Sequence, residues 1–271
     1  MKKLNNKQLN IKSKMKNTFK WMFAAILIFG LTISSCKKDP EPTPEPEPQT
    51  VTRLAKESRT RTTTAISINS SRSFIWENGD LMQISDTIIS MPFGIEQFYQ
   101  NNMVYENGNL TGVEEENDHY QFSFTYENGL VKTFLNALEN DTTTWGEVTA
   151  YTEDGHVREY LDYNNYRLSR WTITWADGDA IEVKEEILEP EELVTTRVVT
   201  YTYDNNPSVF TGIPLAWAIK DGDGIAVARF MSKHNQIEEG YTYNYDENGL
   251  LTSIVAENDS TFYNYIEQTL R

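Results

Sequence analysis

Six short segments, in each of which an aromatic residue closely precedes Asn-Gly or Asp-Gly, constrain the fold of this chain most strongly. They are Trp76–Gly79, Tyr105–Gly108, Tyr126–Gly129, Tyr151–Gly155, Trp175–Gly178 and Tyr245–Gly249. Asn-Gly and Asp-Gly accept the positive φ of type I′ turns, whose twist matches that of the flanking antiparallel strands. The six segments therefore predict a series of β-hairpins.

The residues beside these turns alternate with the period of a β-strand. Residues 122–126, 171–175, 199–203 and 241–245 place an aromatic or aliphatic side chain at every second position, with Thr, Ser or Asn between. This pattern collects the rings on one face of a sheet. Residues 65–271 are therefore predicted to be an all-β domain, an antiparallel meander of about a dozen strands. A sheet of that size is expected to curve or close into a barrel-like body, since an open one exposes long edges.

Two segments interrupt the alternation and are the expected helical or irregular lid elements. Residues 91–99 predict a short helix, with Pro92 tolerated near its start. Residues 206–217 contain Pro207 and Pro214 and cannot form a regular strand. We expect this second segment to fold over the sheet or the barrel mouth as a plug or lid.

The first 35 residues have the features of a bacterial lipoprotein signal peptide. Seven Lys precede or flank the apolar run 21–31, which is too short to span a membrane. Met15 is an alternative start that leaves an ordinary basic region. Residues 31–36, Leu-Thr-Ile-Ser-Ser-Cys, resemble a lipobox, which implies cleavage before Cys36 and its acylation. The alternative is a cleaved secretory signal followed by an incidental Cys.

Residues 36–64 are expected to form a tether. Five of the nine Pro residues lie between residues 40 and 48 and mostly alternate with Glu, which favours extended polyproline II. Residues 51–64 either continue the tether or form the first strand. Residues 36–41 also resemble the charged tails that send Bacteroidota lipoproteins to the cell surface. The expected location is the outer membrane, with the protein at the cell surface or on the periplasmic face.

Charge and cysteine content exclude several function classes. Residues 36–271 carry 17 basic and 40 acidic residues, so the body repels nucleic acid. A single Cys excludes an intrachain disulfide and a cysteine zinc site. The sequence also contains none of the common catalytic motifs, such as Gly-x-Ser-x-Gly or His-Glu-x-x-His. These observations favour a non-catalytic protein.

Ionisable residues give only weak indications of chemistry. His119, His156 and His234 lie at expected hairpin ends or loops, and the Glu runs at 114–116 and 185–186 are interpreted as solvated strand ends. Asp221 and Asp223 resemble the start of a calcium-binding loop, although no Glu stands at the twelfth position. A simple turn is the alternative interpretation, and no other cofactor is expected.

The lipobox, the Pro/Glu tether and the hairpins together resemble a known family. With the block formed by Tyr203, Asp204, Asn205, Pro207 and Phe210, they are similar to Bacteroidota lipoproteins described as porin-like in fold. The hairpins are also similar to the Tyr-Asp repeats of Rhs-type proteins. The resemblance implies a porin-like β-domain and implies no activity.

The aromatic stripes are the main candidate for a binding site. The residues are Trp171, Trp175, Tyr201, Tyr203, Tyr241 and Tyr243. Their rings form either a platform that stacks on sugars or the hydrophobic core of the domain. Three functions remain open: a binding or structural module that contacts a surface protein, a glycan or small-ligand binder, and a hydrolase with two facing carboxylates. A cavity lined by Trp and Tyr that stays open beside residues 206–217 favours the binder.

Overall fold

A computed structural model of the chain describes residues 49–63, 66–116, 120–138, 141–164, 167–188, 193–221 and 223–270. The predicted signal peptide, Cys36 and the Pro-rich part of the tether lie outside these residues. No helix within the described ranges has the length and apolar character needed to cross a membrane.

The described chain is built almost entirely from β-strands. The strands are β1 (Gln49–Thr62), β2 (Ser67–Glu77), β3 (Asp80–Met91), β4 (Ile95–Glu106), β5 (Asn109–Glu115), β6 (Tyr120–Glu127), β7 (Leu130–Leu138), β8 (Asp141–Tyr151), β9 (Val157–Asn164), β10 (Arg167–Ala176), β11 (Asp179–Leu188), β12 (Leu193–Thr200), β13 (Thr202–Pro207), β14 (His234–Ile237), β15 (Thr242–Tyr245), β16 (Leu251–Ala256) and β17 (Asp259–Leu270). Two short helices, α2 (Leu215–Asp221) and α3 (Gly224–Met231), lie between β13 and β14.

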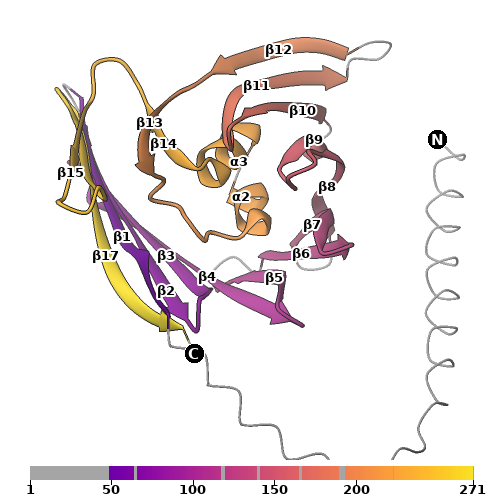
Figure 1. The fold of residues 1–271 in the computed structure, drawn as a ribbon, viewed down its shortest axis with the longest axis horizontal. Helices are drawn as coiled ribbons and strands as arrows, with labels where there is room; N and C mark the ends of the chain where they lie inside the picture. Colours follow the sequence, from indigo (N-terminus) through magenta and orange to yellow (C-terminus); the bar gives the residue numbers. More distant parts are fainter. Residues whose placement is uncertain are drawn as a thin grey trace, which may run out of the picture. The chain divides into compact units, whose positions relative to one another are not determined.

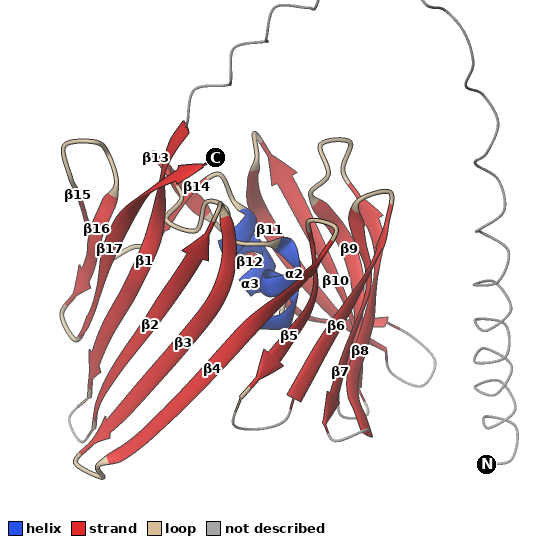
Figure 2. Ribbon diagram, turned by 90° about the horizontal axis from the view of Figure 1, so that it is seen from below, coloured by secondary structure: helices blue, strands red, loops and turns tan. Residues whose placement is uncertain are grey.

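Fifteen strands form one antiparallel meander sheet that curls around the two helices (Figure 1). Its order is β12-β11-β10-β9-β8-β7-β6-β5-β4-β3-β2-β1-β17-β16-β15, and β13 and β14 form a separate pair. Within the described chain the end strands β12 and β15 do not pair with each other, so the sheet is curved and not strictly closed (Figure 2). The all-β meander with short helical elements is confirmed, with more strands than the sequence predicts.

The six turn segments join consecutive strands, as the sequence predicts. Asn78, Asn107, Asn128 and Asp177 have φ between 49° and 54°, and the Gly that follows each of them also has positive φ. Only residues that tolerate this left-handed backbone allow so tight a reversal.

In five of the six turn segments, the aromatic residue before the turn has a second role that the sequence does not reveal. Its OH or indole N–H donates a hydrogen bond to a backbone carbonyl of the preceding hairpin or strand. The bonds run from Trp76 to Leu54 (2.8 Å), Tyr105 to Leu81 (2.9 Å), Tyr126 to Leu110 (2.7 Å), Tyr151 to Val131 and Trp175 to Val157 (2.7 Å). Tyr203, outside the six segments, makes the same kind of bond to Ala180 (2.7 Å), whereas Tyr245 of the sixth segment donates to the carboxylate of Asp204. The carbonyls lie beside β-bulges, where the backbone ladder is interrupted. We call this series the aromatic ladder.

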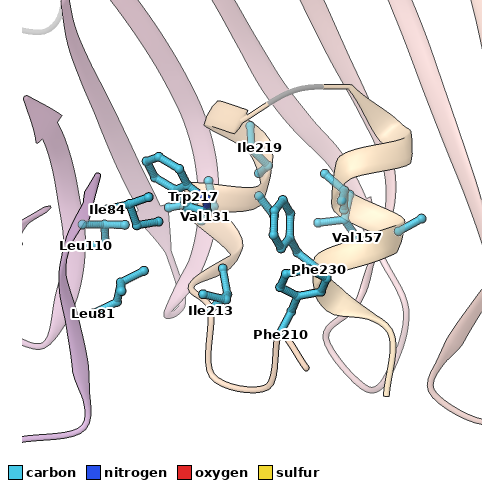
Figure 3. Packing of buried hydrophobic residues seen from close by; sticks show 14 of the residues in the cluster. Leu81, Ile84, Leu110, Val131, Val157, Phe210, Ile213, Trp217, Ile219 and Phe230 are labelled. Atoms are coloured by element: carbon cyan, nitrogen blue, oxygen red, sulfur yellow. The ribbon is translucent and has the colours of Figure 1, made fainter. Parts of the chain in front are cut away.

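The core forms where the inner face of the sheet meets the helices (Figure 3). Trp217 of α2 is fully buried together with Leu81 and Ile84 of β3. Gly224 begins α3 against Trp171: a Cβ at this Gly would lie 2.6 Å from the indole Cε3. The helix can therefore approach the sheet closely only because residue 224 has no side chain.

The structure contradicts one sequence-based interpretation and adds detail to two others. Residues 91–99 do not form a helix; they form the β3–β4 hairpin, because Gly94 reverses the chain with φ of 64° and β4 continues from Ile95. Residues 51–62 belong to β1, so the sheet begins at Gln49 and not at residue 65. Residues 206–217 do plug the curved sheet, but they lead into α2, and Phe210 and Ile213 are buried.

Candidate functional site

A cavity of about 350 Å³ lies between the two ends of the curved sheet. We call it the edge cavity. It is lined by Arg197, Val199 and Tyr201 at the β12 end, by Tyr241, Tyr243, Leu251, Ile254, Asp259, Thr261, Tyr263, Glu57 and Arg59 at the opposite end, and by Ser208, Val209, Phe210, Ile225, Arg229, Asn235, Gln236 and Glu238 between them. The incomplete closure of the sheet therefore leaves space bounded by several elements that are distant in sequence.

Two arginine–carboxylate pairs line one wall of the edge cavity. Arg59 of β1 binds Asp259 of β17 through two hydrogen bonds, with Nε to Oδ1 at 2.9 Å. The hydrogen bond from Arg59 lowers the pKa of Asp259 below its usual value. Arg229 of α3 reaches Glu57 of β1, with Nη2 to Oε1 at 3.2 Å. These pairs tie the inner helix and the last strand to β1.

Tyrosine rings supply the aromatic surface of the edge cavity. The OH of Tyr201 is buried and has no hydrogen-bond partner among the described residues, and burial raises the pKa of this phenol. The OH of Tyr243 accepts a hydrogen bond of 2.8 Å from the backbone N–H of Glu238. No Trp is among the residues that line the cavity, so the expected Trp and Tyr lining is realised by Tyr alone.

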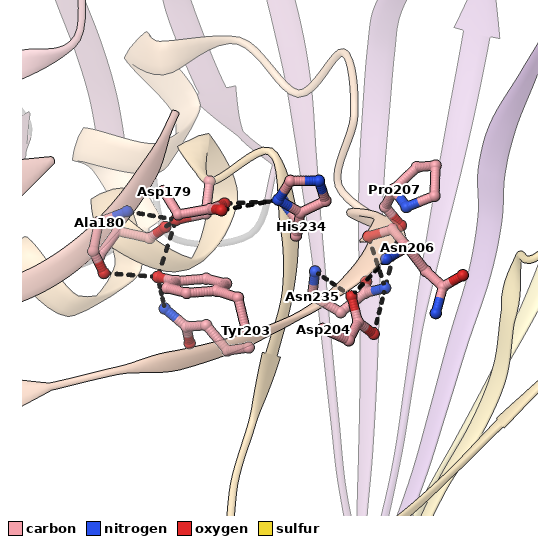
Figure 4. A network of polar contacts seen from close by, with 11 residues as sticks. Asp179, Ala180, Tyr203, Asp204, Asn206, Pro207, His234 and Asn235 are labelled. Carbon is pink, nitrogen blue, oxygen red and sulfur yellow. Dashed lines mark hydrogen bonds and ion pairs between the residues drawn. The ribbon is translucent and has the colours of Figure 1, made fainter. Parts of the chain in front are cut away.

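A polar network holds β13 and β14 across the gap between the sheet ends (Figure 4). Asp204 accepts hydrogen bonds from the N–H of Asn206 at 2.8 Å and from Asn235 Nδ2 at 3.2 Å, and it also accepts one from the OH of Tyr245 in β15. Asp179 accepts a 2.9 Å hydrogen bond from the N–H of His234. The network fixes Asn235 at the cavity wall.

The structure divides the six predicted ring residues into two groups. Trp171 is buried and stacks on Tyr160, with ring centroids 6.3 Å apart. Trp175 and Tyr203 belong to the aromatic ladder. These three residues serve the core. The other three, Tyr201, Tyr241 and Tyr243, line the edge cavity.

The predicted ionisable residues have mainly structural contacts. Asp223 caps α3, accepting hydrogen bonds from the N–H groups of Ile225 (2.9 Å) and Ala226 (3.2 Å), while Asp221 is the last residue of α2. Among the described residues, no three His, Cys, Asp or Glu side chains form a group able to hold a metal ion. Calcium binding stays a prediction.

Two expectations about solvated residues are wrong. His234 begins β14 and is half-buried, with Nδ1 at 2.7 Å from Asp179 Oδ2, so it is not a free loop residue. Glu186 is buried on β11 and pairs with Arg170 at 2.6 Å and Lys184 at 2.8 Å. These hydrogen bonds lower its pKa.

The pKa of one further carboxylate, that of Asp162, is shifted in the opposite direction. Asp162 of β9 has a buried Oδ1 with no hydrogen-bond partner among the described residues. Burial raises the pKa of Asp162 to about 6, and the nearby charges of Asp223 and Glu185 add to this effect. Asp162 does not line the edge cavity.

Sequence reasoning did not identify the arginines of the edge cavity. Glu57 and Arg59 lie two residues apart on β1, and side chains at this spacing point to the same face of a strand. The sequence could therefore have indicated that these two residues lie side by side. The partner of Arg59, Asp259, lies 200 residues away in sequence, so the sequence offers no local indication of the pair.

Comparison with known proteins supports the fold. No protein-family model matches the chain, and no curated protein matches it. Among solved structures, it is similar to a porin-like protein from Bacteroides uniformis, with 10% sequence identity and a TM-score of 0.51. The match covers 79% of this chain and 96% of that protein. At this identity the likeness shows a shared porin-like fold.

Proposed function

We propose that this chain is a lipid-anchored, non-catalytic binding protein of the outer membrane that holds a glycan or similar small ligand in the edge cavity. The observation that carries this proposal is the 350 Å³ cavity, which stays open between the sheet ends beside the inner helices. Tyrosine rings and polar groups in one concave site suit the apolar faces and hydroxyl groups of a sugar.

Anchoring follows from the N-terminal sequence. The lipobox resemblance implies that Cys36 carries the lipid, and the porin-like neighbour from a Bacteroides species supports an outer-membrane setting. On β2, the polar residues Asn69, Ser71 and Ser73 lie on the face opposite buried Phe74, together with exposed Ile75. Replacing Cys36 by Ser is expected to move the mature protein from the membrane fraction to the soluble fraction.

Catalysis by a carboxylate pair has less support. A general acid of a glycoside hydrolase needs a raised pKa, so that it carries a proton near neutral pH. In the edge cavity, Arg59 lowers the pKa of Asp259, and Arg229 binds Glu57. Both carboxylates are therefore suited to holding the arginines in position.

Binding is tested by calorimetric titration of the protein with a panel of neutral and acidic oligosaccharides. Tyr241→Ala is expected to lower the affinity for an oligosaccharide that binds at least about tenfold, and a tenfold change corresponds to about 1.4 kcal/mol of binding free energy. Tyr99→Ala, on β4 outside the cavity, is the matched control and is expected to leave affinity unchanged. Absence of binding to the whole panel would contradict the glycan proposal.

A partner-binding module is the second candidate, and one observation favours it. The β3–β4 hairpin carries Met91, Phe93 and Ile95 at its tip, and these side chains are 50%, 66% and 53% exposed. Clustered exposed apolar side chains of this kind mark interaction surfaces. Phe93→Ser with Ile95→Ser is expected to abolish co-purification of a surface partner and to leave glycan binding intact.

A further inference from the structure

The charged groups of the edge cavity are not equally accessible. In the Arg59–Asp259 pair, the arginine side chain is 44% exposed and the aspartate 12%. In the Arg229–Glu57 pair, the corresponding values are 41% and 14%. In both pairs the carboxylate side chain is more covered than the arginine side chain, so the arginine is the more accessible partner.

Arg197 adds a third guanidinium at the opposite wall of the cavity. Its side chain is 53% exposed, and its contact with Asp223 is long, with Nη1 to Oδ2 at 3.8 Å. Asp223 uses its other oxygen, Oδ1, to cap α3. Arg197 is therefore the arginine of the cavity that can turn toward a ligand without breaking a close ion pair or uncapping the helix.

Aromatic rings line the same cavity as the arginines. The guanidinium carbon of Arg229 is 4.8 Å from the ring centroid of Phe210, which also lines the cavity, and Tyr201 follows β12 four residues after Arg197. Planar guanidinium groups bind carboxylates through paired hydrogen bonds, and rings pack against the C–H faces of sugars. A single ligand that offers both surfaces is a sugar ring that bears a carboxylate.

We infer that the edge cavity selects acidic saccharides of the uronic acid class, with Arg197 contacting the sugar carboxylate. This inference rests on the proposed function and narrows it to one class of glycan. The body of the protein is acidic, so an anionic ligand is repelled everywhere except where arginines are concentrated. Three carboxylates line the cavity: Glu57 and Asp259 are paired with arginines, whereas Glu238 is exposed and opposes an anionic ligand.

The test uses residues 47–271, which form one compact unit. The probes are short oligomers of galacturonate, glucuronate and mannuronate, each as the free acid and as the methyl ester, titrated by calorimetry. The ester keeps the sugar ring and removes the charge. We expect at least one acid to bind and its ester to bind at least tenfold more weakly.

Two variants assign the charge effect to the edge cavity. Arg197→Gln is expected to lower the affinity for the acid about tenfold and to leave the affinity for the ester unchanged. Glu238→Gln is expected to raise the affinity for the acid. Arg158→Gln removes an equally exposed arginine on β9, outside the cavity, and is expected to change neither. Unchanged melting temperatures verify that the variants fold.

The outcomes separate this inference from the proposed function. Equal binding of acid and ester, or an acid affinity that Arg197→Gln leaves intact, overturns the selection of acidic saccharides. If no acid binds while neutral oligosaccharides bind in a Tyr241-dependent manner, the inference fails and the proposed function stands. If no saccharide of either kind binds, both fail.

Discussion

The inner face of the sheet is used in two different ways. Around α2, which we call the filled side, Trp217 packs with Leu81 and Ile84 and leaves these side chains without solvent contact. Between β12 and β15, the open side, inward positions carry Arg59, Asp259 and Tyr241 around the edge cavity. The difference teaches that the hairpins alone form the curved sheet, whereas the inserted helices determine which part of its inner face is covered.

Removal of the largest side chain from the filled side is expected to have the largest effect. Trp217→Ala should lower the free energy of unfolding by about 3–5 kcal/mol, because it leaves a cavity among well-packed neighbours. Tyr241→Ala on the open side should cost much less, since its ring already borders open space. Chemical denaturation of both variants measures the two values, and equal losses would break the comparison.

Two carboxylates, one outside the edge cavity and one on its wall, should respond to pH in opposite ways. Asp162 has a folded-state pKa of about 6, above its unfolded value, so its charged form destabilises the fold above pH 6. Asp162→Asn should therefore stabilise the protein at pH 7 by roughly 1–2 kcal/mol, the full linkage value being discounted for partial solvent screening. This gain should shrink as the pH falls from 7 towards 4.

Asp259 provides the matched case, because Arg59 lowers its folded-state pKa. Its contribution to stability is present above its unfolded pKa and is lost as the pH falls through the folded value. Asp259→Asn should then destabilise the protein at pH 7 by about 1 kcal/mol or less, and the difference should vanish in strong acid. Melting curves from pH 3 to 8 test both signs, and parallel curves for the two variants would contradict them.

The aromatic ladder allows the smallest and most specific test. Tyr105→Phe removes the hydrogen bond to the carbonyl of Leu81 and should cost about 1 kcal/mol, since the acceptor loses its partner. Tyr243→Phe on the open side removes the acceptor of the hydrogen bond from the N–H of Glu238. Because Glu238 is exposed, water can accept that hydrogen bond instead, so this change should lower stability less. Denaturation midpoints of the two variants give the comparison directly.

Local chemistry explains which parts of the fold were predictable. Asn78-Gly79 and its counterparts set the turns because their backbone preferences act within four residues. Residues 91–99 were misassigned to a helix because the reversal at Gly94 depends on the pairing of β4 with β3 and of β3 with β2. The irregular lid expected at residues 206–217 includes only the start of α2, and α3 was not expected, since the burial of both helices inside the sheet is a tertiary effect.

The candidate site was less predictable than the fold. The alternation in residues 199–203 and 241–245 identified Tyr201 and Tyr241, but it could not separate them from Trp171, whose ring is buried against α3. That distinction depends on where the sheet ends meet the helices, which no local pattern encodes. The pairing of Arg59 with Asp259 joins opposite ends of the domain and is likewise visible only in three dimensions.

The pairing of β1 with β17 has a consequence for biosynthesis. Gln49 lies opposite Leu270, so β1 obtains one of its two neighbours from β17, which is made much later. A partly synthesised chain therefore presents one side of β1 without its hydrogen-bond partners until β17 has been made, and such a side can capture strands from other chains. We therefore expect β1 to be the strand through which partly made chains associate until β17 pairs with it.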